Sequence, residues 1–224
     1  MAARLLSVNI VRELIRDVRG DLEKTAIDKR PVDGPVAVSA ADADQVGLAG
    51  DQVVDTRHHG GPDKAVYAYA VEDLRWWADH LGRELPPGTF GENLTTEGLD
   101  VTGAVIGERW RVGSDVELEV TYARIPCRTF HGWIDEPHWV KRFTERGAPG
   151  AYLRVLRGGY VAAGDRVEVV HRPDHGVTIA DTFPIGNASD GQLKDLLAMP
   201  GLGKALERAA RLSLAGRQRH RVRP

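Results

Sequence analysis

Cys127 is the only thiol in this chain of 224 residues, and its neighbours could make it reactive. It follows a strand-like run, residues 116–123, and Pro126 cannot donate a hydrogen bond to a sheet, so we expect the thiol at a strand end. Arg124 and Arg128 flank it, and nearby cations favour the thiolate, the form that binds metals and attacks electrophiles. The alternative is that Cys127 is a small buried core residue, as a lone cysteine often is.

Two polar loops that contain glycine could bring further groups to such a site. The first holds the run His58-His59-Gly60-Gly61 and leads into an apolar strand, residues 65–70. If this loop is extended, its two imidazoles point to opposite faces, so one of them can enter a given site. Its glycines would let a ligand approach the backbone closely. The competing interpretation is a tight loop with solvated imidazoles.

The second loop, residues 88–96, contains Asn93, whose amide can both donate and accept hydrogen bonds. Its pattern is less specific, because asparagine also tolerates the left-handed backbone of turns. We therefore expect Asn93 to serve either as a polar contact in a site or as a turn residue.

The elements that must position these loops indicate a β-rich domain. Strands are predicted within residues 5–18, 36–38, 65–70, 106–112, 115–123, 151–156 and 165–171, and helices at 72–85 and 137–146. Many short strands with glycine turns and few intervening helices favour a barrel-like β domain over a parallel α/β sheet. The fold class that we expect is mainly β with some α.

The character of the chain changes after residue 172. Short helices are predicted at 177–183, 189–199 and 201–214, and Ser189 with Gln192 forms a capping-box pattern. We therefore expect residues 1–172 to form the β domain, 173–216 a small three-helix domain and 217–224 a basic, frayed tail. An exposed apolar face on the helical part could support a homodimer.

Bulk properties narrow the classes of partner. The chain is 42% apolar and 28% charged, which is ordinary for a globular protein, and its net charge of −2 gives no reason to expect a nucleic acid or a membrane as partner. No apolar run approaches the roughly 20 residues that span a bilayer. One cysteine excludes an internal disulfide and fits a reducing compartment, and residues 1–18 lack the features of a signal peptide. We expect a cytoplasmic protein.

Six short motifs occur in an order that resembles the MOSC family, named for the C-terminal domain of molybdenum cofactor sulfurases. They are Lys24-Thr25-Ala26-Ile27, Gly50-Asp51, residues 58–67, Phe90-Gly91-Glu92-Asn93-Leu94, Arg124-Ile125-Pro126-Cys127 and Gly164-Asp165. The helical segment after residue 171 resembles the appendage of the YiiM-like branch. The resemblance covers nearly the whole chain and implies a MOSC-type β-barrel.

The resemblance also implies a function and a site. The family binds a molybdenum cofactor (molybdopterin) and reduces N-hydroxylated compounds, such as hydroxylaminopurines and amidoximes, to amines or amidines. Cys127 matches the family cysteine taken to ligate molybdenum, and His59 is the proton donor that we expect. The positions that match the cofactor and substrate pocket are Lys24, Thr25, Ala26, Ile27, His58, Gly60, Gly61 and Asn93, and the cofactor phosphate would be held by Lys24, Arg124 or Arg154.

Two alternative functions remain open on the same residues. Cys127 could carry a persulfide in a sulfur-transfer reaction, or the chain could bind molybdopterin as a carrier without turnover. For the reductase, the sequence has no flavin, haem or iron–sulfur signature, so a separate reductase would have to supply the electrons. The family resemblance also suggests binding of a pyridoxal-phosphate-like ligand.

Overall fold

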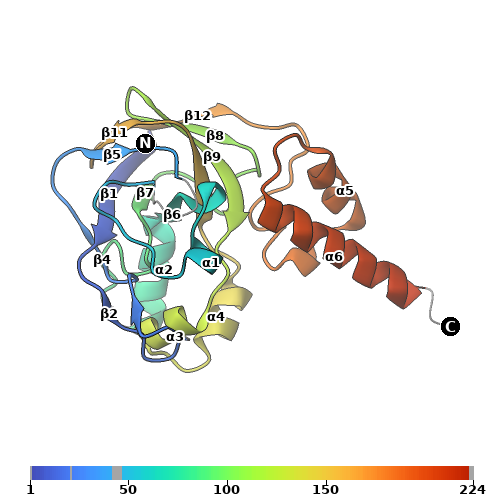
Figure 1. The fold of residues 1–224 in the computed structure, drawn as a ribbon, viewed down its shortest axis with the longest axis horizontal. Helices are drawn as coiled ribbons and strands as arrows, with labels where there is room; N and C mark the ends of the chain where they lie inside the picture. The colour runs from blue at the N-terminus through green and yellow to red at the C-terminus, as the bar shows by residue number, and fades with distance from the viewer. Residues whose placement is uncertain (1, 21, 42–46, 222–224) are drawn as a thin grey trace.

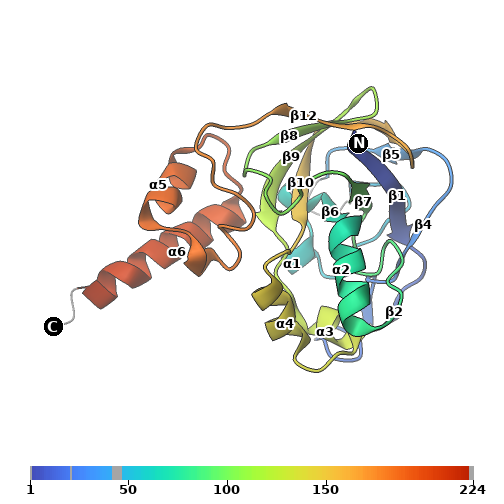
Figure 2. The same cartoon turned by 180° about the vertical axis from the view of Figure 1, so that it is seen from behind.

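The computed structural model describes residues 2–20, 22–41 and 47–221, without the side chains of residues 57, 58 and 218–221. Figure 1 shows a strand-rich body with the helices α2, α3 and α4 at one end, and a helical unit that projects from its side. The reverse view in Figure 2 shows the same separation of the two parts.

Eight strands form one sheet in the order β12-β8-β9-β10-β6-β7-β1-β4. Their bounds are β1 (Arg4–Val11), β4 (Lys29–Pro31), β6 (Val66–Ala70), β7 (Leu94–Glu97), β8 (Arg109–Val112), β9 (Val116–Ala123), β10 (Ala151–Arg157) and β12 (Val167–His171). Neighbours are antiparallel except β6 and β7, which are parallel. The predicted sheet-rich fold is therefore confirmed.

The sheet curls until β1 meets the segment that leads into β12. The Leu5 N–H donates to the Asp165 carbonyl at 2.8 Å, and the Val167 N–H donates to the Ala3 carbonyl at 2.9 Å. One isolated bridge, between Arg4 and Arg166, accompanies these bonds. The β1 strand and the start of β12 are thus joined by a few local hydrogen bonds rather than by a continuous ladder.

Two short strand pairs lie outside this sheet. They are β2 (Ile15–Arg16) with β3 (Lys24–Thr25), and β5 (Val36–Val38) with β11 (Gly159–Val161). The strand predicted over residues 5–18 is therefore two strands, β1 and β2, with a break at residues 12–14. Gly158 alone separates β10 from β11.

Side-chain alternation explains how the strands build the core. In β9, Val116, Leu118 and Val120 are buried, whereas the intervening Glu117 and Glu119 are partly exposed, as a period of two requires. All of β6 is buried because β10 and β7 flank it and α2 packs against it. The segments that surround the site are therefore attached to a rigid sheet.

The helices near the site are α1 (Thr56–His59), α2 (Val71–Leu81), α3 (Arg128–Ile134) and α4 (Trp139–Arg146). The predicted helices α2 and α4 are present, although α2 ends at Gly82, whose φ of 62° favours glycine. Helix α3 was not predicted. It brings Phe130 into a cluster of aromatic rings with Phe90, Trp139 and Phe143, whose centroids lie 5.2–6.0 Å apart.

The helix predicted at residues 177–183 is wrong. These residues form turns, and Val177, Ile179 and Phe183 pack into the core of the strand-rich body. The Ile106 N–H donates to the Val177 carbonyl at 3.0 Å, and the Ile179 N–H donates to the Ala104 carbonyl at 2.9 Å. Residues after 172 therefore stay attached to the body before the helical unit begins.

The helical unit consists of the 3-10 turn η2 (Ile185–Asn187), α5 (Asp190–Ala198) and α6 (Lys204–Arg221). The Ser189–Gln192 capping box is confirmed, and Ala188, Leu193 and Ala210 form a small separate core. The predicted frayed tail is wrong for residues 217–221, because α6 continues through them. The proposed division into domains at residue 172 stays a prediction.

Within the described part of the chain, no helix combines the length and the apolar character that crossing a bilayer requires.

Candidate functional site

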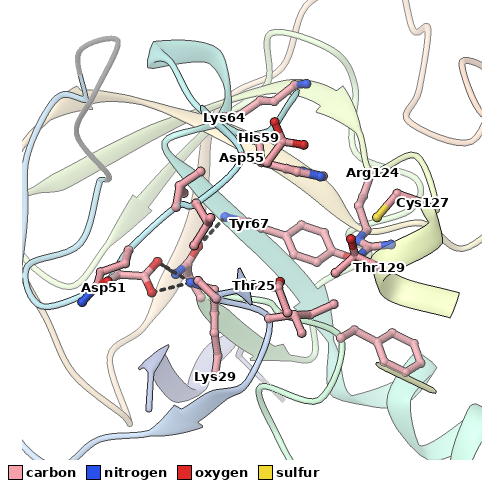
Figure 3. Close-up of a pocket in the computed structure, with 18 of the residues that line it drawn as sticks. Thr25, Lys29, Asp51, Asp55, His59, Lys64, Tyr67, Arg124, Cys127 and Thr129 are labelled. Carbon is pink, nitrogen blue, oxygen red and sulfur yellow. Dashed lines mark hydrogen bonds and ion pairs between the residues drawn. The ribbon is translucent and has the colours of Figure 1, made fainter. Parts of the chain in front are cut away.

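A cavity lies where loops from the first half of the chain meet the ends of β9 and β10. It is lined by residues from six separated segments, within 17–29, 51–55, 59–67, 90–93, 124–129 and at 152. Figure 3 shows Cys127, Arg124 and Thr129 on one side of it and Lys29 with Asp51 on the opposite side. A wider mouth, which shares several of these lining residues, connects the site to solvent. Cys127 lines both the cavity and the mouth.

Cys127 presents its sulfur to this cavity and is partly exposed. Its Sγ accepts a hydrogen bond from the Phe130 N–H at 3.5 Å, so the side chain caps the first turn of α3. His59 and Asn93 line the same cavity. Cys127 is therefore not a fully buried core residue, although it also packs against the edge of the core.

Arg124 is a buried cation in the same wall, with 4% of its surface exposed. Its guanidinium carbon lies 3.5 Å from the ring centroid of Phe130 and 5.8 Å from that of Tyr67. Its Nη1 has no hydrogen-bond partner among the described residues. Because a buried charge without a counter-ion is unfavourable, this nitrogen marks a position where an anion would be stabilised.

His59 and Tyr152 form a hydrogen-bonded pair at the cavity wall, with 3.1 Å between Nδ1 and Oη. Burial raises the pKa of Tyr152 to about 12, although the nearby Arg124 cation opposes the rise. The phenol therefore keeps its proton at neutral pH. Tyr152 can donate to a neutral imidazole or accept from a protonated one.

A buried polar network closes the far side of the cavity. Lys29 forms an ion pair with both carboxylate oxygens of Asp51, and Asp51 also accepts from the Val11 N–H at 2.9 Å and the Asn93 amide at 2.8 Å. Burial lowers the pKa of Lys29, and the Asp51 carboxylate partly offsets this. The Asn93 Oδ1 accepts from the Tyr67 N–H at 3.1 Å. These bonds fix the loops at residues 51 and 93 to the sheet.

Lys64 adds a third cation, where the cavity meets its mouth. Burial lowers its pKa, and the carboxylates of Asp55 and Asp63 oppose that effect. Lys64 is the last residue of the 3-10 turn η1 (Pro62–Lys64). The Thr121 hydroxyl holds this turn in place by donating to the Asp63 carbonyl at 2.5 Å.

The structure brings most of the predicted site residues together. The cavity is lined by Lys24, Thr25, Ala26, Ile27, His59, Asn93, Arg124 and Cys127. Gly60 and Gly61 do not line it. The extended geometry expected for the two histidines is wrong, because both belong to α1; the His58 side chain lies outside the described residues.

Arg154 is the clearest correction among the predicted phosphate contacts. It lies outside the cavity and donates to Asp63 at 2.5 Å, to Glu119 at 3.1 Å and to the Gly201 carbonyl at 3.1 Å. Its donors join elements of the fold and do not face a phosphate in the cavity.

Several lining residues were not predicted as site residues, among them Lys29, Lys64, Tyr67, Gly91, Thr129 and Tyr152. Gly91 has a φ of +76°, and a Cβ there would lie 3.2 Å from Cγ1 of Ile27, so the glycine permits a close approach. The adjacent Phe90-Gly91-Glu92-Asn93 motif could have pointed to Gly91. Lys29 and Tyr152 lie in strands and carry no such local signal.

Comparison with known proteins agrees with this geometry. The MOSC domain model matches residues 55–168. The uncharacterized protein YflK of Bacillus subtilis (strain 168) is 33% identical over 175 residues, covering 78% of this chain and 76% of YflK. A protein named "Reductase" from Gibberella moniliformis is 33% identical over 156 residues, covering 66% of this chain but 26% of that longer protein.

The fold is also similar to solved structures. YiiM from Geobacillus stearothermophilus superposes with a TM-score of 0.76 at 26% identity, covering 95% of this chain and 99% of that one. This coverage extends beyond the residues matched by the domain model and includes the helical unit. The chain belongs to the MOSC domain family as a YiiM-like member.

Proposed function

We propose that this chain binds a molybdenum cofactor and reduces N-hydroxylated compounds to amines or amidines. The observation that carries the proposal is that one cavity is lined both by the sole thiol, Cys127, and by Arg124 with its unpartnered buried nitrogen. A soft metal ligand and a binding position for an anion are thus present on one wall.

The donor set fits this cofactor. Among the described residues, no three His, Cys, Asp or Glu side chains cluster as a metal site would require. A metal in this cavity would therefore bring most of its ligands with it, as molybdenum does in its dithiolene cofactor, and Cys127 would add one thiolate. Arg124 would bind the cofactor phosphate, and Lys24 lines the same cavity as a further cation.

The reaction needs two electrons and two protons. The N–O bond of the substrate breaks, one proton is added to the nitrogen in place of the hydroxyl group, and the hydroxyl takes the other proton and leaves as water. When bound, the cofactor supplies the two-electron redox chemistry. We expect the electrons to come from a separate reductase protein, and the name of the fungal relative is consistent with a reductive role.

His59 and Tyr152 are suited to deliver a proton. In the protonated state of His59, Nδ1 donates to the Tyr152 oxygen and Nε2 carries the second ring proton. Loss of the Nε2 proton leaves a neutral ring whose Nδ1 still donates to Tyr152. The imidazole can therefore release a proton to a leaving oxygen while it keeps its bond to Tyr152. Such a positioned acid typically contributes about 10²–10⁴-fold to a rate.

The mouth favours substrates with an apolar body. Leu22, Val54 and Ile125 line it and remain 37–46% exposed, and Tyr122 lies among them. An aromatic amidoxime or a hydroxylaminopurine would place its ring against these side chains. The cations deeper in the cavity would stay reserved for the anionic cofactor.

The test is turnover by cofactor-loaded protein with an artificial electron donor, with benzamidoxime and 6-hydroxylaminopurine as substrates. We expect the wild type to form benzamidine and adenine, and Cys127→Ala to lose at least about 100-fold in rate. Equal rates in the two proteins, or no turnover by stoichiometrically loaded wild type, would contradict the proposal. Cyanide-labile sulfur on Cys127 without bound metal would instead favour sulfur transfer.

A further inference from the structure

We propose that Ala205, in the first turn of α6, lines one side of the cavity mouth and that its small side chain allows wide groups to reach Cys127. The mouth is lined by Tyr122, Ile125 and Cys127 from the strand-rich body and by Ala205 from the helical unit. The helical unit is then part of the substrate site rather than a separate appendage.

The position of α6 at the mouth is fixed by a clamp that joins it to the body. Arg154 in β10 donates to the Gly201 carbonyl at 3.1 Å, and the same guanidinium pairs with Asp63 and Glu119. Gly201 lies four residues before Ala205, so the clamp sets where the helix begins. Figures 1 and 2 show α6 starting beside β9 and then leading away from the body.

Gly203 makes this close approach possible. It is buried, and a Cβ at this position would lie 2.8 Å from Oδ2 of Asp63, closer than real contacts allow. Asp63 directly precedes Lys64, which lines both the cavity and its mouth. The turn before α6 therefore rests against the η1 turn of the site itself.

The small side chain at position 205 leaves the mouth open. Ala205 is exposed, so a larger residue there would extend into the mouth without disturbing the core. Leu22, Val54 and Ile125 line the same mouth, so a bulky group at position 205 would narrow the space that they share. A residue larger than alanine should exclude wide substrates while small ones still pass.

The single cysteine supplies a readout that does not depend on catalysis. We would measure the labelling rate of Cys127 in the full chain with iodoacetamide and with fluorescein maleimide, in wild type, Ala205→Trp and Ala215→Trp. Ala215 is exposed on the same helix and does not line the mouth, so it is the matched control. Thermal unfolding of each variant would verify that it is folded.

We expect Ala205→Trp to slow the maleimide at least about tenfold, to change the iodoacetamide rate by less than about twofold, and Ala215→Trp to change neither. Unchanged rates in Ala205→Trp, equal slowing of both reagents, or the same slowing in Ala215→Trp would overturn the proposal. The consequence for substrates rests on the proposed function: benzamidoxime turnover should fall, and hydroxylamine turnover should not. If labelling changes as expected and no turnover occurs, the mouth is correct and the proposed function is wrong.

Discussion

The guanidinium of Arg124 stacks on the ring of Phe130, with 3.5 Å between the guanidinium carbon and the ring centroid. Phe130 belongs to α3, whose first turn is capped by Cys127. The arginine and the cysteine are therefore positioned by the same short helix. Both side chains lie on the same side of one cavity, so a single ligand there could contact the Cys127 sulfur and Arg124 together.

Replacing Arg124 with methionine should separate stability from binding. The methionine keeps apolar packing on Phe130 but removes a buried charge whose Nη1 has no partner among the described residues, so the cofactor-free protein should become more stable by about 1–3 kcal/mol. If Arg124 binds phosphate, pyrophosphate should stabilise the wild type against unfolding, and this stabilisation should be absent in Arg124→Met. Urea unfolding with and without pyrophosphate measures both, and Arg208→Met on the exposed face of α6 is the control. A less stable variant that keeps the pyrophosphate effect would contradict the assignment.

Removing the cation of the buried ion pair between Lys29 and Asp51 should have the opposite effect on stability from Arg124→Met. Lys29→Met leaves the Asp51 carboxylate buried and without its counter-ion, so we expect a loss of about 3–5 kcal/mol in the free energy of unfolding. Arg75→Met, which breaks an exposed pair with Glu97, should have little effect. Chemical denaturation measures both variants. If Lys29→Met destabilised the protein as little as Arg75→Met does, the network of Lys29, Asp51 and Asn93 would not hold the cavity together.

Tyr152 should make stability depend on pH in the alkaline range. Its pKa in the folded state is about 12, above the ordinary value of 10, so the folded protein keeps a proton that the unfolded chain releases. The stabilisation is complete below pH 10 and is lost as the pH rises toward 12, about 3 kcal/mol in total. Tyr152→Phe should therefore show a shallower loss of stability over this range in thermal unfolding. A slope equal to that of the wild type would rule out this role.

His59→Gln tests the proton donor. Glutamine can still hydrogen-bond to Tyr152 but cannot supply a proton, so we expect kcat to fall about 10²–10⁴-fold with little change in KM, and the pH profile near neutrality to flatten. His80→Gln is the control, because His80 lies on the exposed side of α2, stacked on Trp76. An unchanged rate and pH profile would leave His59 only a structural role.

Local pattern predicted the elements of the sheet because their side chains alternate in the sequence itself, as Val116, Leu118 and Val120 do in β9. It failed at residues 177–183, whose apolar side chains fill the core from a string of turns. It also missed α3, because Cys127 is an unusual capping residue and Gly132 weakens a helical pattern. The structure of both segments depends on tertiary contacts, which a local sequence pattern does not contain.

The same distinction applies to the site. Cys127, Arg124 and Asn93 stand in motifs whose residues are adjacent, so they could be predicted. Lys29 could not, because its partner Asp51 is distant in the sequence and the pair forms only when the loops are folded. Arg154 was assigned to the wrong role, since a basic residue in a strand reads the same whether it contacts a ligand or, as here, Asp63 and Gly201.

The most direct measurement of the central claim is the molybdenum content of purified wild type beside Cys127→Ser, both made in a host that synthesises the cofactor. The serine hydroxyl is a harder and weaker ligand than a thiolate, so we expect about one molybdenum per wild-type chain and at least about tenfold less in the variant. Wild type without molybdenum, or a folded variant with the same content as wild type, would contradict the account.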